Sequence, residues 1–303
     1  MDSKKSFDVK IARFGVKILN YYIKKRTYLQ PPPTQDEIWN NLFGTNNFII
    51  HQLENNIKLK LYKESILCKL IYFGFEENEI VFIKKFIKKG DVLIDIGSNI
   101  GLFSLHASKI VGDTGKVFAI EPTPITFKRL VENINLNQFN NIKTFNIGLS
   151  NKRETLRFNI SNDGHDAWNS FADLFELENS TSVEIEVSTI DNLIKENNVN
   201  HIDLIKLDVE GWEKFVLEGG EELLKMDDTP AFMIEFTEEN AFSAGYYCGE
   251  IYDFLKNYDY EWYTYDAKNN ELNKEVKKLH YPYNNLIAVK NFEDCIKRLK
   301  DQE

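Results

Sequence analysis

One short stretch constrains the fold more than any other, Asp91-Val-Leu-Ile-Asp-Ile-Gly-Ser-Asn-Ile-Gly101. The apolar run after its first aspartate is typical of a strand that is buried on both faces of a parallel sheet. Asp95 ends that strand with a carboxylate, and Gly97 gives the backbone a conformation that a Cβ would forbid. Gly101 lets a following helix pack closely against the sheet. The pattern predicts a strand that turns sharply into a helix and presents its backbone to a nucleotide-like ligand.

A carboxylate 20 residues beyond Gly101 indicates which ligand. Glu121 ends a second apolar strand, where the ribose of an adenosine would present its hydroxyls. A dinucleotide fingerprint has a glycine where its pyrophosphate meets the backbone, but this chain has Asn99 there. The cofactor that carries adenosine without phosphate is S-adenosylmethionine, and its amino acid end suits Asp95. We therefore expect this cofactor and not NAD; an ordinary tight turn without a ligand is the alternative, and Glu121 counts against it.

Composition and charge narrow the class of protein. The 303 residues can bury one substantial core, and 43% hydrophobic with 28% charged residues is typical of globular chains. A net charge of -10 disfavours a general nucleic-acid binder. No apolar run reaches the length of a membrane span, and no secretion signal is expected. The cysteines have neither disulfide nor zinc spacing, so we expect a cytoplasmic location; they are Cys68, Cys248 and Cys295.

The N-terminal end has a different character. Residues 1–30 hold eight basic and two acidic side chains, and residues 6–26 predict an amphipathic helix that Pro31 to Pro33 would end. Such a helix could make a peripheral contact with an anionic membrane surface. It could also pack on its own domain or on a second subunit of a homo-oligomer, which we favour. The apolar stripe comprises Phe7, Ile11, Phe14 and Ile18.

In the rest of the chain, segments with the periodicity of a helix alternate with segments with the periodicity of a strand. Residues 48–62 predict a β-hairpin, and from residue 78 strands and helices alternate with short links. This order is typical of a doubly wound, mostly parallel sheet. We expect an N-terminal extension over 1–75 and a cofactor-binding domain over 76–303. The predicted strands are 92–95, 116–121, 142–147, 202–208, 231–236, 262–266 and 286–290, with an added hairpin, 155–160 and 183–187, that flanks a mobile loop at 161–170.

Four ordered motifs resemble the FkbM-type family of S-adenosylmethionine-dependent methyltransferases. They are Gly90–Gly101, Ala119-Ile-Glu-Pro122, Asn146-Ile-Gly-Leu-Ser150 and Ile205-Lys-Leu-Asp-Val-Glu-Gly-Trp-Glu213, and the resemblance spans about residues 70–290. It implies a class I methyltransferase fold, Rossmann-like, with a mostly parallel seven-stranded sheet and an antiparallel last strand. It also implies O-methylation, often of sugars in glycans or natural products.

Within these motifs we assign two groups of residues to the ligands. Ser98 replaces an alanine that is frequent in the family, a harmless change, whereas Trp212 occupies a variable position and is assigned to the substrate. The residues assigned to the cofactor are Asp95, Gly97, Asn99, Gly101, Glu121, Ser150 and Asp208.

Catalysis is expected beyond the carboxyl ends of the strands, where an open parallel sheet binds its ligands. Methyl transfer to a hydroxyl needs alignment and the removal of a proton, and Asp208 and Glu210 are the candidate bases. Each could instead only support the following helix. Glu235 could bind acceptor hydroxyls or be a solvated rim carboxylate, and His165, on the loop at 161–170, is the rival base.

Several alternatives remain at this point. Asp208, Glu210 and Glu235 could hold a divalent cation, but no compact ligand spacing marks one and we predict no metal. A non-sugar small molecule could be the acceptor. Amine or nucleic-acid N-methylation is disfavoured by the acidic charge and by Leu207-Asp-Val-Glu-Gly211. A degenerate cofactor fold that serves as an interaction module is the alternative to an enzyme.

Overall fold

The computed structural model describes residues 33–161, 180–226 and 228–301. The chain divides into two compact units, residues 1–45 and 46–303. Helix α2 (Gln35–Phe43) is the element described in the first unit. It begins with a reciprocal cap, in which the Glu37 amide donates to the Thr34 hydroxyl and the Thr34 amide donates to the Glu37 carboxylate. The predicted basic helix at 6–26 lies outside the described residues.

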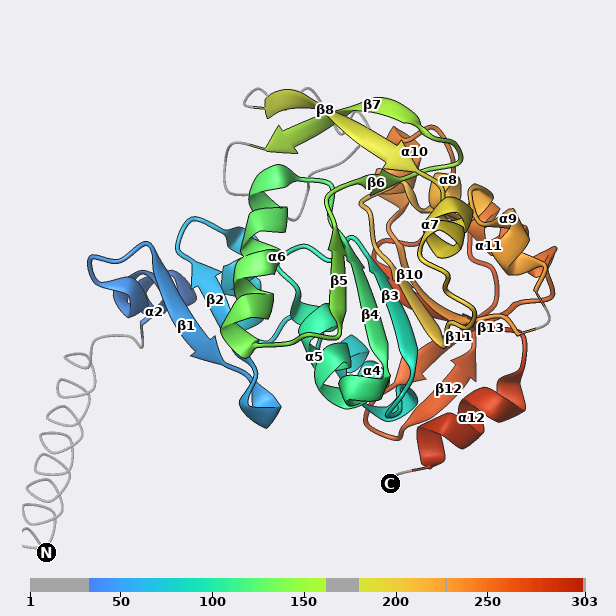
Figure 1. Ribbon diagram of the computed structural model, residues 1–303, viewed down its shortest axis with the longest axis horizontal. Coiled ribbons are helices and arrows are strands. Elements are labelled where there is room, and N and C mark those ends of the chain that lie inside the picture. The colour runs from blue at the N-terminus through green and yellow to red at the C-terminus, as the bar shows by residue number, and fades with distance from the viewer. Residues whose placement is uncertain (1–32, 162–179, 227, 302–303) are drawn as a thin grey trace, which may run out of the picture. The chain divides into compact units, whose positions relative to one another are not determined.

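The second unit is built on one large twisted sheet (Figure 1). Its eight strands are arranged in the order β12-β11-β13-β10-β9-β3-β4-β5. The five from β10 to β5 are parallel, and β13 is antiparallel to both of its neighbours. The strands are β3 (Val92–Ile96), β4 (Lys116–Ile120), β5 (Ile142–Phe145), β9 (Leu204–Leu207), β10 (Ala231–Phe236), β11 (Glu261–Asp266), β12 (Glu271–Lys274) and β13 (Asn284–Val289).

This topology agrees with the expected doubly wound sheet and its antiparallel last strand. It has one strand more than the expected seven. The additional strand, β12, lies at the edge and pairs with β11 alone. Its sequence, Glu-Leu-Asn-Lys, has one apolar residue, so the local pattern does not mark it as a strand.

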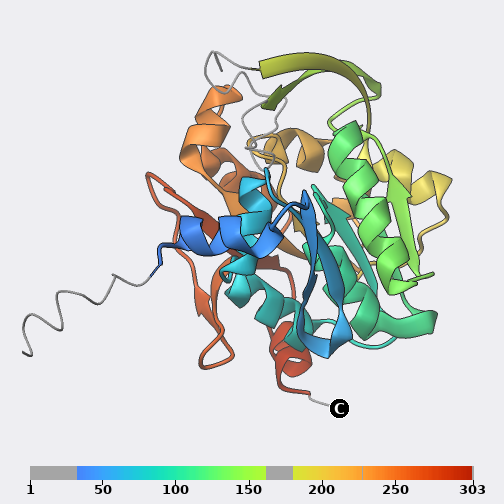
Figure 2. The ribbon, with the colours of Figure 1, turned by 90° about the vertical axis from the view of Figure 1, so that its left-hand side faces the viewer.

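Helices cover both faces of the sheet (Figure 1 and Figure 2). Alternation along the strands separates two apolar cores: Leu93 belongs to one and Ile94 to the other. The Leu93 core includes side chains of α4 (Glu77–Phe86), α5 (Leu102–Val111) and α12 (Phe292–Lys300). The Ile94 core includes side chains of α7 (Ile190–Glu196), α8 (Glu213–Glu218), α9 (Glu221–Leu224), α10 (Glu238–Ser243) and α11 (Cys248–Lys256).

A second, smaller sheet lies beyond the carboxyl ends of the parallel strands (Figure 1). Strands β7 (Glu154–Ser161) and β8 (Ser180–Ser188) form the added hairpin that the sequence predicts, and β6 (Gly148–Leu149) pairs with β8 in parallel. Residues 162–170 of the predicted loop between them lie outside the described residues.

The hairpin predicted before the domain is also present, and it belongs to the same compact unit as the sheet. Strand β1 (Phe48–Gln52) pairs with β2 (Lys58–Tyr62), and a single 3-10 turn, Glu54–Asn56, joins them. Two asparagines of α6 (Pro124–Asn137) bond to the backbone of β2. The Lys58 amide donates to Asn137 Oδ1 (2.8 Å), Asn137 Nδ2 donates to the Lys58 carbonyl (2.7 Å), and the Lys60 amide donates to Asn133 Oδ1 (2.7 Å). Helix α6 thus covers the outer edge of the hairpin. Along the chain, the hairpin is followed by helix α3 (Ile66–Tyr72).

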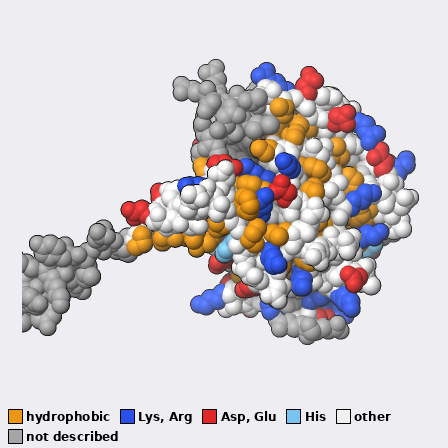
Figure 3. Space-filling view, turned by 60° about the vertical axis from the view of Figure 1, so that its left-hand side comes forward, with side chains coloured by type: hydrophobic (Ala, Val, Ile, Leu, Met, Phe, Trp, Pro, Cys, Tyr) orange, Lys and Arg blue, Asp and Glu red, His pale blue; other side chains and the backbone are white. Residues whose placement is uncertain are grey.

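The surface of this unit mixes apolar and charged side chains (Figure 3). Among the exposed apolar residues are Phe48 and Ile50 of β1. Within the described ranges, no helix is both long and apolar enough to cross a membrane.

Candidate active site

The glycine turn after β3 adopts the conformation that its sequence predicts. Gly97 and Gly101 have φ values of +84° and +97°, in the left-handed region that favours glycine. A Cβ on Gly101 would lie 2.8 Å from the Leu130 side chain of α6. A Cβ on Gly97 would lie 1.8 Å from the Asp208 carbonyl oxygen. The turn is therefore closed against α6 on one side and against the end of β9 on the other.

Glu121 supports this turn from the end of β4. Its side chain is 5% exposed, and its carboxylate accepts hydrogen bonds from the Asn99 amide (3.1 Å) and the Thr123 amide (2.9 Å). Burial raises the pKa of Glu121 to about 7 although these bonds oppose the shift. The assignment of Glu121 to the ribose hydroxyls of an adenosine stays a prediction.

Asp95 provides the second polar group of the cofactor end. The side chain is fully buried, and the Ser104 hydroxyl of α5 donates to its Oδ2 (2.6 Å). Burial raises the pKa of Asp95. Within the described structure its Oδ1 has no hydrogen-bond partner. A buried acceptor without a donor suits the ammonium group of a methionine moiety, so the residues present fit S-adenosylmethionine.

Three predicted carboxylates meet at the acceptor end. One oxygen each from Asp208, Glu210 and Glu235 lie within 4.8 Å of one another. The Thr237 hydroxyl donates to Glu235 (2.8 Å), and Asn240 Nδ2 donates to Glu210 (2.7 Å). Glu235 is 6% exposed, so it is a buried group and not a solvated rim carboxylate.

The charge of this cluster is balanced in part by a lysine. Burial, together with the neighbouring carboxylates, raises the pKa of Glu210 and Glu235 well above the usual range. Lys206 Nζ lies 2.8 Å from Asp208 Oδ2, and the Lys206 side chain is 5% exposed. These three carboxylates are close enough to hold a cation, and the absence of a metal stays a prediction.

Sequence reasoning missed Lys206 although a signal existed. It is the one charged residue in the otherwise apolar strand Leu204-Ile-Lys-Leu207. A lysine at a position buried on both faces of a sheet must be paired, and acidic residues were already expected at the neighbouring strand ends.

A second missed residue, Glu213, organises the loop that carries Asp208 and Glu210. Its carboxylate accepts from the Val209 amide (2.9 Å), the Gly211 amide (3.3 Å) and the Tyr246 hydroxyl (3.1 Å). Burial raises the pKa of Glu213 to about 7. Glu210 has a φ of +54° in this loop, so its position depends on these bonds.

The remaining predicted residues are placed as follows. Trp212 Nε1 donates to the Ser150 hydroxyl (3.2 Å), and the indole packs on Phe215 with ring centroids 4.3 Å apart. This bond joins the segment after β6 to the loop after β9, while the roles of Trp212 and Ser150 toward ligands stay predictions. His165 lies outside the described residues.

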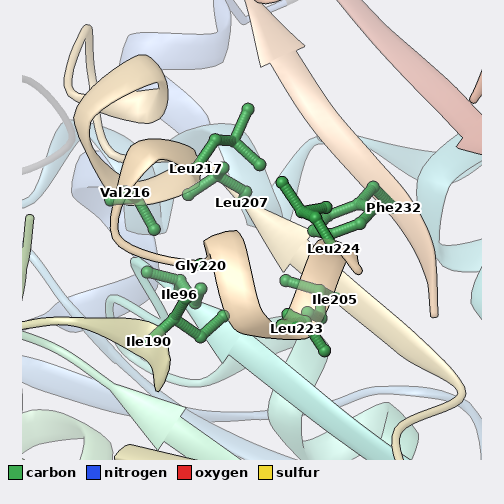
Figure 4. Close-up of a pocket in the computed structure, with 10 residues that line it drawn as sticks. All are labelled: Ile96, Ile190, Ile205, Leu207, Val216, Leu217, Gly220, Leu223, Leu224 and Phe232. Atoms are coloured by element: carbon green, nitrogen blue, oxygen red, sulfur yellow. The ribbon is translucent and has the colours of Figure 1, made fainter. Parts of the chain in front are cut away.

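A small, partly open cavity lies elsewhere, between the sheet and helices α8 and α9 (Figure 4). Its lining is apolar side chains and one glycine, which cannot orient a polar acceptor. We regard it as a gap in core packing. The lining residues are Ile96, Ile190, Ile205, Leu207, Val216, Leu217, Gly220, Leu223, Leu224 and Phe232.

Comparison with known proteins identifies the family of this chain. The family described as "Methyltransferase FkbM domain" matches residues 95–262. The chain is 37% identical over 97 residues to a tRNA(Phe) (4-demethylwyosine(37)-C(7)) aminocarboxypropyltransferase of Pyrococcus horikoshii, a match that covers 32% of each chain. It is 32% identical over 148 residues to the hexuronic acid methyltransferase AglP of Haloferax volcanii, covering 48% of this chain and 56% of that protein. The matches thus span about a third and about half of those relatives.

Two further similarities are more distant. The 2-O-methyltransferase NoeI of Sinorhizobium fredii is 25% identical over 184 residues, which cover 57% of this chain and 74% of NoeI. The crystal structure of a methyltransferase FkbM from Methylobacillus flagellatus is similar with a TM-score of 0.41 and 16% identity, covering 67% of this chain and 43% of the other.

The family match extends over more than half of the chain and includes the glycine turn, Glu121 and the acidic cluster. It confirms the expected class I methyltransferase fold and S-adenosylmethionine as the cofactor. The chain belongs to the FkbM-domain methyltransferases.

Proposed function

We propose that this methyltransferase methylates a hydroxyl group of a neutral sugar, in a glycan or a glycosylated natural product. S-adenosylmethionine supplies an activated methyl group on its sulfonium. The observation that carries the proposal is the contact between the two ends of the site. Gly97 of the cofactor turn packs against the Asp208 backbone, and the Asp208 side chain belongs to the acidic cluster.

The chemistry of the cluster favours a hydroxyl acceptor. Carboxylates accept hydrogen bonds from hydroxyl groups and repel anionic groups. Lys206, the basic side chain that the described structure places among them, is buried and paired with Asp208, so it is not available to bind an anion. AglP and NoeI are named as a hexuronic acid methyltransferase and a 2-O-methyltransferase, which supports a sugar. The cluster favours a neutral sugar over an acid.

Asp208 is the residue that we propose as the base. Its ion pair with Lys206, with Nζ and Oδ2 2.8 Å apart, holds the carboxylate in place at the end of β9. Glu210 and Glu235, whose pKa values are raised, retain a proton more readily and are better suited to hold neighbouring hydroxyls. General bases typically contribute about a hundredfold to ten-thousandfold, so Asp208→Asn should lower turnover on that scale.

The test is transfer of a labelled methyl group to a panel of neutral sugars, amino sugars and uronates. Mass spectrometry and NMR of the product then locate the new bond. We expect a methyl ether on a neutral sugar. A methyl ester on a uronate, or methylation at nitrogen, would contradict the proposal.

The alternative of a cofactor-binding interaction module is separable in the same assay. It requires tight binding of S-adenosylhomocysteine together with no turnover on any acceptor. The preserved cluster at the acceptor end favours an enzyme, because a module without an acceptor has no use for three buried or half-buried carboxylates that face one another.

A further inference from the structure

We propose that Lys206 is a positioning residue, which fixes the Asp208 carboxylate at the acceptor end through a buried ion pair. The inference deepens the proposed function and rests on it, because it gives a role to the neighbour of the proposed base. Lys206 lies in β9, the strand between β3 and β10. The residue as a whole, backbone included, is 4% exposed.

The direction of the Lys206 side chain follows from strand register. Asp95 of β3 is its partner across the parallel ladder, so both side chains lie on the same face of the sheet. On that face, Lys206 Nζ lies 4.7 Å from the centre of the Phe103 ring of α5. The lysine is thus enclosed between the sheet and the helix that follows the glycine turn.

The electrostatics of this position keep the lysine charged. Burial alone would lower the pKa of Lys206, but the carboxylates of Asp208, Asp95 and Glu76 outweigh burial and raise it. Of these, Asp208 makes a direct ion pair with Lys206, with Nζ and Oδ2 2.8 Å apart. A buried ammonium is stable only with such partners, so the position of each group restricts the other.

The ion pair matters because of what else faces Asp208. Glu210 and Glu235 bring two further carboxyl groups within 4.8 Å of the Asp208 oxygen. Without the lysine, the Asp208 carboxylate would lose the ion pair that holds it in place beside them. It could then no longer accept a proton from the acceptor at its present position.

A double-mutant cycle tests whether Lys206 acts through Asp208. Lys206→Met keeps most of the chain length and removes the charge. Lys206→Met and Asp208→Asn are compared, alone and together, in single-turnover methyl transfer to the neutral sugar acceptor. We expect each to slow transfer by about a hundredfold or more, and the double variant to be within about threefold of Asp208→Asn.

The binding of S-adenosylhomocysteine is measured in the same variants and should fall much less than the transfer rate, because the direct ion pair joins Lys206 to Asp208 and not to Asp95. Lys290→Met is the matched control. Lys290 also lies over an aromatic ring, 5.2 Å from the centre of Tyr260, but bonds to the Leu224 carbonyl and to no site residue. Its transfer rate should stay at the wild-type value.

Additive losses in the double variant would overturn the inference, since they mean that Lys206 acts independently of Asp208. If Lys206→Met does not fold, Lys206→Gln, which can still donate to Asp208, replaces it in the cycle. Failure of both to fold would also overturn the inference in favour of a purely structural role. These outcomes differ from failure of the proposed function, in which the wild-type enzyme methylates no sugar hydroxyl.

Discussion

The backbone of Asp208 occupies the space that a side chain on Gly97 would need. An ideal Cβ on Gly97 would lie 1.8 Å from the Asp208 carbonyl oxygen and 2.9 Å from its carbonyl carbon. The glycine turn after β3 and the segment that follows β9 are therefore in direct backbone contact. We propose that this contact fixes the distance between the bound methyl donor and Asp208.

The contact predicts the effect of one added methyl group at Gly97. Gly97→Ala combines a left-handed φ of +84° with the clash against Asp208, so the turn must move. We expect affinity for S-adenosylhomocysteine to fall by more than about tenfold, which corresponds to strain of roughly 1.4 kcal/mol or more. Isothermal titration calorimetry measures it. Gly245→Ala is the control, because Gly245 has a φ of +89° and no atom within 4 Å of its Cβ position. It should lose stability and keep the affinity, and an equal loss of affinity in both variants would contradict this account.

Removal of the Glu121 carboxylate should weaken cofactor binding. Glu121→Ala loses the acceptor that we assign to the ribose hydroxyls and frees the Asn99 and Thr123 amides. A lost hydrogen bond to a charged group is worth roughly 1.5–3 kcal/mol, which is the expected loss in binding free energy.

Glu238→Ala is a matched control for that variant. Glu238 is also buried and also accepts from two backbone amides, those of Cys248 (3.2 Å) and Tyr281 (3.2 Å), away from the glycine turn. It should destabilise the fold without changing the calorimetric affinity. Unchanged affinity in Glu121→Ala would remove the ribose assignment.

The buried glutamates predict how stability depends on pH. Burial raises the pKa of Glu121 and Glu213 to about 7 from a usual 4.5, so the folded state binds protons that the unfolded state has released. Their contribution to stability is therefore fully present below pH 4.5 and is lost as pH rises through about 7. We expect the free energy of unfolding of the cofactor-free protein to fall between pH 5 and 8 in urea titrations, by up to about 3 kcal/mol per group at 1.36 kcal/mol per pKa unit.

Glu121→Gln should reduce that slope, because a neutral amide cannot ionise. The control is Glu186→Gln, an exposed carboxylate on β8, which should keep the wild-type slope. A free energy of unfolding that rises over the same pH interval would show that other groups, and not these glutamates, dominate the pH dependence of stability.

The charge at the acceptor end predicts discrimination between two matched sugars. A neutral hexose and the uronate of the same configuration differ only in a carboxylate, which the Asp208 carboxylate of the cluster would repel. We expect kcat/KM to favour the neutral sugar by about tenfold or more, the effect of roughly 1.4 kcal/mol. Salt screens such repulsion, so the preference should narrow between low ionic strength and about 0.5 M salt. A preference for the uronate, or no effect of salt, would argue against an electrostatic filter.

The local sequence around the glycine turn was sufficient to predict much of the cofactor end. An apolar strand, a glycine turn and a helix follow one another directly, and the partner Glu121 lies at the end of the next strand. Each feature depends on residues that are close in sequence, or on the rule that parallel strands end at the same edge. The convergence of Asp208 with Glu235 follows from the same rule.

The features that the sequence did not predict depend on distant partners. The ion-pair partner of Lys206, Asp208, is close in sequence, but the enclosure of the lysine beside Asp95 and Phe103 comes from elements more than a hundred residues earlier. The Glu213 carboxylate likewise depends on Tyr246, which lies in the bend between α10 and α11. Local periodicity contains no information about either contact, because tertiary packing decides which side chains meet.

The side-chain amide of Asn137 affects whether β2 can pair with a strand of another chain. It both accepts from the amide and donates to the carbonyl of Lys58, as the peptide group of an adjoining strand would. A side chain from a helix thus imitates a strand, and the outer side of β2 cannot recruit an extended segment from another molecule. This protection of the β2 edge requires neither a charged residue nor a proline on the strand. It is lost if α6 unwinds. Partial unfolding of α6 would therefore expose the backbone amide and carbonyl groups at the outer edge of β2 to pairing with another chain.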